Sequence, residues 1–178
     1  CALLAQPLSP GMTGTATMAT DSEDDDSLKD WTVAMYWDAD NDLDGLTATF
    51  VDMWITHLTN TEDVAMAVYI DGLYDPANIS TYTEEGWVER EALGEMNTSD
   101  PATLQHFLEF VFTEPTIAAE NYCLIVQDHG LDYLGLCVDE SEPKRWFMSV
   151  DGFASAVAGA TAATGGWLDL IEIDACTM

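Results

Sequence analysis

The sequence predicts an α/β fold, a three-layer α/β/α sandwich around a mainly parallel sheet. Two short apolar runs rich in β-branched residues end in the tripeptides DHG at 128–130 and DAC at 174–176, as buried strands of a parallel sheet do. Strand-like runs also alternate with segments of helical periodicity, and parallel neighbours need such crossover connections. A length of 178 residues with 48% hydrophobic content is enough for one domain with a core.

The first half of the chain begins with an appendage and continues with strand and helix in turn. Residues 1–30 contain prolines, glycines and an acidic run, and they offer no core face before Trp31. We therefore expect a flexible acidic N-terminal appendage over 1–30 and one domain over 31–178. Within that domain the patterns predict a strand at 31–37, an amphipathic helix at 43–58, a strand at 64–70 and turns at 71–83.

The second half carries the two tripeptides. Asp100-Pro101 begins a helix whose apolar stripe is Leu104, Phe107, Leu108 and Val111. A strand at 122–126, a hairpin at 134–138 with a polar loop at 139–145, a helix at 150–163 and a strand at 168–173 complete the order. Cys123 and Cys137 are expected to be buried structural thiols, with a mutual disulfide as the alternative.

Charge is the unusual property of this composition. Thirty-three acidic residues against four basic ones give a formal net charge of −29, which excludes nucleic acid as a partner through a basic patch. One interpretation is solubility at high salt, where the Debye length falls to about 3 Å at 1 M. The other is calcium bound to surface carboxylates, and both can hold together.

The beginning of the sequence suggests export. Cys1 precedes a short apolar stretch, as in a lipid-anchored lipoprotein or the tail of a secretion signal. We therefore expect an extracellular or cell-surface location, with a lipid anchor at Cys1 as one form of it. No later stretch reaches the roughly 18 to 20 apolar residues of a membrane span.

His129 and Cys176 are the candidate reactive pair. In open α/β sheets the ligand crevice lies beyond the carboxyl ends of the strands, where both residues fall. A thiol beside an imidazole forms a cysteine nucleophile with its base, because the imidazolium lowers the pKa of the thiol. Alone, a histidine or a cysteine after a strand is usually structural.

The acidic run at 38–44 begins like a calcium loop, with Asp38, Asp40 and Asp42 at alternate positions. Leu43 stands where an EF-hand needs glycine and Thr49 where it needs glutamate, so this is not an EF-hand. These carboxylates are therefore weak metal candidates. The alternative is that they cap the following helix.

Four segments in order resemble the clostripain family of cysteine peptidases: residues 31–44, the helix start at 100–107, residues 127–130 and residues 168–178. The resemblance implies a caspase-like fold, with His129 as general base and Cys176 as nucleophile. It also implies that the backbone N–H groups of Gly130 and Cys176 form the oxyanion hole. Asp174 would select arginine or lysine before the cut bond. The chemistry would need no cofactor, and calcium dependence stays open.

The scarcity of basic residues fits such a specificity. Only Lys29, Arg90, Lys144 and Arg145 could be cut, and the last two lie in the loop where the family is matured by self-cleavage. Lys144 and Arg145 are therefore self-cleavage candidates. The alternative is an exposed basic pair with no role.

These observations predict a secreted or surface cysteine endopeptidase that cleaves protein or peptide substrates after Arg or Lys. Family members continue beyond the nucleophile, so we expect this domain to be incomplete at Met178. Its remainder would be a second processed chain or a segment outside this sequence. The alternative function, of another class, is a non-catalytic acidic surface or assembly module that retains the scaffold.

Overall fold

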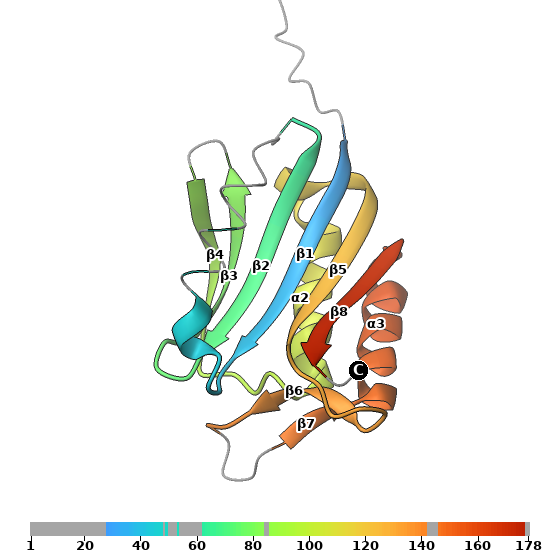
Figure 1. The fold of residues 1–178 in the computed structure, drawn as a ribbon. Coiled ribbons are helices and arrows are strands. Elements are labelled where there is room, and N and C mark those ends of the chain that lie inside the picture. The colour runs from blue at the N-terminus through green and yellow to red at the C-terminus, as the bar shows by residue number, and fades with distance from the viewer. Residues whose placement is uncertain are drawn as a thin grey trace, which may run out of the picture.

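The computed structural model describes residues 28–47, 49, 53, 62–83, 86–141 and 146–176. Six of its strands form one sheet in the order β4-β3-β2-β1-β5-β8 (Figure 1). Their bounds are Lys29–Ala39 for β1, Val64–Gly72 for β2, Ala77–Thr83 for β3, Gly86–Gly94 for β4, Ala119–His129 for β5 and Leu170–Cys176 for β8. The expected appendage, including Cys1, lies outside the described residues apart from its last three positions, two of which already belong to β1.

The centre of the sheet is parallel, as predicted. β1 pairs in parallel with β2 on one side and with β5 on the other, and β5 pairs in parallel with β8. The four strands predicted at 31–37, 64–70, 122–126 and 168–173 are confirmed, with different ends. Because they run in one direction, their carboxyl ends lie along one edge of the sheet.

The prediction of turns at 71–83 was correct for the short connection at 73–76 and wrong for 77–83, which form the strand β3. β3 pairs antiparallel with β2 and with β4. Along β3, Ile79 and Thr81 are buried while Asn78 and Ser80 are partly exposed. This alternation has the strand period of two, but its polar half consists of residues that are also common in turns.

Two helices cover one face of the sheet (Figure 1). α2 spans Pro101–Thr113 and α3 spans Val150–Thr164, which confirms both predicted helices. Asp100 caps α2 by accepting a hydrogen bond from the Ala102 N–H. All four stripe residues of α2 are buried, and the ring of Phe107 lies 6.0 Å from that of Tyr36.

The opposite face carries a second apolar cluster that includes Met35, Trp37 and Val68. The helix predicted at 43–58 is described in part: a 3₁₀ turn η1 spans Asp44–Leu46, and residues 47, 49 and 53 are helical. Leu43 precedes this turn without a side-chain cap, and Asp44 lies in its first turn, so the expected capping of the helix that follows stays a prediction. Most of the predicted helix lies outside the described residues.

Beyond the carboxyl edge of the parallel strands lies a separate hairpin (Figure 1). β6 (Gly135–Asp139) pairs antiparallel with β7 (Trp146–Ser149). A second 3₁₀ turn, η2 (Pro115–Ile117), connects α2 to β5. Among the described residues, none of the helices has the length and apolar character needed to cross a membrane.

The cysteine predictions can be checked on the described thiols. Cys123 and Cys137 are buried free thiols, as expected, and the alternative disulfide does not form. The expectation that the last strand is buried was wrong: Leu170 is 51% and Ile171 43% exposed. The reason is that β8 is hydrogen-bonded to one strand only, β5, among those described.

Candidate active site

The site lies where β5 and β8 end. His129 is the last residue of β5 and Cys176 the last residue of β8, and the two are partners in the parallel register. The sulfur of Cys176 lies 4.0 Å from Nδ1 of His129. The structure therefore brings the two residues together, as their positions after apolar runs predicted.

Each member of this pair favours the charged form of the other. The hydrogen bond to His129, followed by one from the Gly130 backbone, lowers the pKa of the Cys176 thiol. The same contact with Cys176, followed by one with Asp42, raises the pKa of His129. A thiolate beside an imidazolium is the reactive form of a nucleophilic cysteine, and the Cys176 side chain is exposed to reagents.

Gly130 follows His129 directly and is buried. It forms an isolated bridge with Leu136 of β6, which ties the end of β5 to the hairpin. A backbone donor of Gly130 already lies within reach of the thiol. An N–H at this position can also donate to an oxygen of a group bound to that sulfur.

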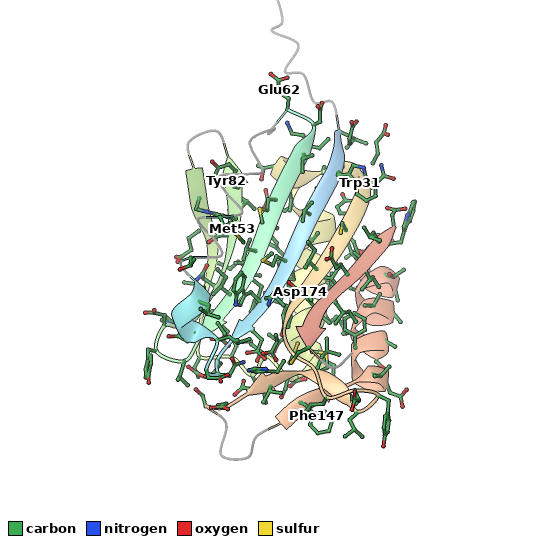
Figure 2. All side chains as sticks on the ribbon, in the orientation of Figure 1. Trp31, Met53, Glu62, Tyr82, Phe147 and Asp174 are labelled. Carbon is green, nitrogen blue, oxygen red and sulfur yellow. The ribbon has the colours of Figure 1, made fainter. Side chains whose placement is uncertain are left out.

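Asp174 lies on β8 near its carboxyl end (Figure 2). It is exposed and precedes Cys176 by two positions. Because side chains alternate along a strand, Asp174 and Cys176 project from the same face of β8. A carboxylate there can meet a cationic side chain of a ligand bound at the thiol.

The residues predicted to bind metal do not converge. Oδ1 of Asp38 accepts a hydrogen bond from the Asp40 N–H, and Oδ1 of Asp40 accepts one from the Ser141 hydroxyl at 2.7 Å. Asp42 instead contacts His129, with 2.7 Å between Oδ1 and Nε2. The structure thus directs the three carboxylates to three different partners.

The contact between Asp42 and His129 was missed by the sequence analysis. The local DxDxD pattern suggested calcium or a helix cap, and the two residues are 87 positions apart. A signal did exist: the acidic run follows β1, and β1 is the parallel neighbour of the strand that ends in His129.

Another acidic group lies beneath the site. Ligand atoms of Asp38, Asp128 and Cys137 lie within 4.8 Å of one another, and all three residues are buried. Burial raises the pKa of each of them, which favours their neutral forms over the anionic forms that bind cations. Asp128 also accepts a hydrogen bond from the side-chain amide of Asn41 at 2.7 Å. We assign this cluster a supporting role.

A depression of about 400 Å³ opens beside His129 on the side of Asp42. Its lining residues are Asp42, His129, Gly130, Leu131, Val138 and Glu140. The self-cleavage candidates Lys144 and Arg145 lie outside the described residues, between β6 and β7 in the chain.

A thiol and an imidazole at the carboxyl ends of neighbouring parallel strands define a class: α/β proteins with a site for nucleophilic cysteine chemistry. A family model described as "Clostripain family" matches residues 35–178. The chain belongs to the clostripain family of cysteine peptidases. No curated protein matches the sequence.

Solved structures share the fold. A secreted C11 cysteine protease from Bacteroides thetaiotaomicron, in complex with an irreversible peptide inhibitor, superposes with a TM-score of 0.66 at 17% identity and covers 84% of this chain. An inactive zymogen C11 protease from Parabacteroides distasonis superposes with a TM-score of 0.65 at 20% identity, also over 84% of this chain. The fold is therefore the caspase-like one. This chain spans 43% of the length of each of those two proteins.

Proposed function

We propose that this chain carries the catalytic Cys176–His129 dyad of a cysteine endopeptidase. The observation that carries the proposal is the 4.0 Å approach of the Cys176 sulfur to Nδ1 of His129 at paired strand ends. The shifts of the two pKa values toward the ion pair support it. The exposure of the thiol also fits a polypeptide substrate.

The reaction would proceed in two halves. The Cys176 thiolate attacks the scissile carbonyl carbon, and the oxyanion accepts hydrogen bonds from the backbone N–H groups of Gly130 and Cys176. The His129 imidazolium gives its proton to the leaving amine as the C–N bond breaks, which leaves a thioester. Water, deprotonated by His129, then attacks the thioester, and the acid product leaves as the thiol is restored.

We propose Asp174 as the residue that selects Arg or Lys before the cut bond. Its carboxylate is exposed on the same face of β8 as the nucleophile. A guanidinium can meet a carboxylate through two parallel hydrogen bonds, which favours arginine over neutral side chains.

Self-cleavage after Lys144 or Arg145 is proposed from the sequence alone, because this pair lies between the two dyad residues and outside the described structure. The test is intact mass analysis of the native protein and of a Lys144→Ala/Arg145→Ala variant. We expect two fragments from the native protein and one uncut chain from the variant. The same fragments from both would reject it.

We also propose an extracellular or cell-surface location. One solved relative is described as secreted, and the large negative charge suits a protein that meets salt directly. Fractionation of producing cells, with detection by antibody, tests this: protein confined to the soluble interior would reject it.

The experiment for the dyad and for Asp174 is active-site labelling of the native protein with an arginyl-ketone probe, read by peptide mass spectrometry. A glutamyl probe tests specificity, Cys176→Ala removes the nucleophile, and Asp174→Asn removes the carboxylate. Asp30→Asn, an exposed residue at the other end of the sheet, is the charge-matched control. We expect arginyl labelling at Cys176 in the native protein and in Asp30→Asn only.

The outcomes separate the proposals. Labelling by both probes alike would reject the role of Asp174 and keep the dyad. A folded protein that neither probe labels, with calcium supplied, would reject the peptidase and favour a non-catalytic surface module.

A further inference from the structure

We propose that Asp42 is a positioning residue for His129, which it holds in the tautomer and orientation that face the nucleophile. This inference rests on the proposed peptidase function and adds a third member to the dyad. It also replaces the calcium role that the acidic run suggested for Asp42. Asp42 acts through His129 and does not itself touch the substrate.

The geometry assigns each ring nitrogen a different partner. Nδ1 of His129 faces the Cys176 sulfur at 4.0 Å, whereas Nε2 lies 2.7 Å from Oδ1 of Asp42. A carboxylate only accepts hydrogen bonds, so Nε2 carries the proton and donates it to Asp42. Nδ1 is then left to exchange a proton with the thiol, which is the orientation that a base needs.

The backbone on both sides of Asp42 is anchored although its own side chain is 80% exposed. The preceding residue, Asn41, is buried and donates from its amide to Asp128 at 2.7 Å and to the Val138 carbonyl at 3.2 Å. Its Oδ1 also accepts from the Leu43 N–H at 2.9 Å. Asn41 thus ties the loop after β1 to β5 and to the hairpin, and it presents Asp42 to His129.

Among the described residues, four ionisable groups lie around His129. They are Cys176 on β8, Asp42 on the loop after β1, Asp128 on β5, and Glu140, which lines the same depression. Of these, Asp42 forms the short contact with Nε2. Its removal is therefore expected to lower the pKa of His129 without removing the other three.

The first test needs no activity. The chain contains three histidines, so NMR titration of their ring Cε1–H signals can follow His129 in a Cys176→Ala background, where coupling to the thiol is absent. Asp42→Ala and Asp42→Asn are each compared with the control Asp30→Asn. We expect a lower titration midpoint for His129 in Asp42→Ala, a smaller fall in Asp42→Asn because its amide oxygen still accepts, and no change in Asp30→Asn. An equal midpoint in all variants would overturn the inference.

The second test uses hydrolysis of an arginyl peptide by the native protein with Cys176 intact. We expect Asp42→Ala to lower kcat by about tenfold, to leave KM unchanged and to move the alkaline limb of the kcat/KM profile to lower pH. Asp42→Asn should recover part of kcat. An unchanged rate and profile in Asp42→Ala would reject the role of Asp42, whereas absence of Cys176-dependent hydrolysis in the native protein would reject the peptidase itself.

Discussion

Two aspartates of this chain have different surroundings, because one is exposed and the other is buried. Asp42 is exposed and interacts with an imidazole, whereas Asp71 is buried at the end of β2. Oδ2 of Asp71 accepts from the Tyr69 hydroxyl at 3.1 Å, and Oδ1 has no hydrogen-bond partner among the described residues. Burial raises the pKa of Asp71 to about 8, so this carboxyl retains its proton at neutral pH.

The raised pKa of Asp71 predicts how the free energy of unfolding changes with pH. Its folded pKa of about 8 lies above an unfolded value of about 3.9. The stability that the proton provides is therefore fully present below about pH 4 and is lost as pH rises toward 8. Asp71→Asn stays neutral at all pH values. The difference in free energy of unfolding between Asp71→Asn and wild type should therefore shift in favour of the variant by at least about 1 kcal/mol from pH 5 to pH 9. Urea denaturation at several pH values measures this.

The control for Asp71→Asn is Asp75→Asn, an exposed carboxylate in the turn after β2. It should leave the pH dependence as in wild type. If the difference between Asp71→Asn and wild type stays constant over this pH range, the raised pKa is refuted.

At this scale the sequence predicted that His129 and Cys176 meet, and it missed the contact between His129 and Asp42. His129 and Cys176 stood out because each ends an apolar run, and a parallel sheet brings such ends together. Asp42 did not, because its contact depends on the order of β1 and β5 in the sheet. Strand order is a long-range property that no local pattern contains.

At the scale of elements, the β6–β7 hairpin supports the end of β5. The Leu131 N–H donates to the Gly135 carbonyl at 2.9 Å, and Gly130 is bridged to Leu136. Gly135 is needed for close packing, since a Cβ atom there would lie 2.1 Å from the Met148 carbonyl oxygen. The hairpin therefore determines where Gly130 lies relative to the thiol.

Gly135→Ala should destabilise the fold by about 1–3 kcal/mol, the usual cost of overpacking a close contact. It should also slow alkylation of Cys176 by iodoacetamide at neutral pH, because the Gly130 donor moves away from the sulfur. Urea denaturation and peptide mass spectrometry measure the two effects. Gly45→Ala is the matched control, since a Cβ atom there meets nothing within 4 Å. Equal behaviour of the two variants would argue against this role of the hairpin.

The elements that the sequence predicted correctly are those with a strong period and clear end signals. The helix α2 has Asp100 and Pro101 at its start and a stripe of buried apolar residues. The strand β3 was missed because its polar residues are also common in turns, and no element was predicted over the residues of β4. The exposure of β8 was missed for a different reason: an apolar run does not reveal whether a strand is central or at an edge.

At the scale of the whole molecule, charge opposes the compact state. The chain has only four basic side chains against 33 acidic ones. Self-repulsion of this kind destabilises the folded state more than the expanded unfolded chain, where the charges are farther apart.

Salt should therefore stabilise this protein. Raising NaCl from about 0.1 M to 1 M shortens the Debye length from about 10 Å to 3 Å, and we expect the free energy of unfolding to rise steeply over this range and to level off above it. Thermal or urea unfolding at fixed pH measures the change, and sucrose at equal water activity separates screening from exclusion of solute. A stability independent of NaCl, or raised equally by sucrose, would show that the charge of −29 is tolerated without screening. Adaptation to salt would then have to be abandoned as the reason for this composition.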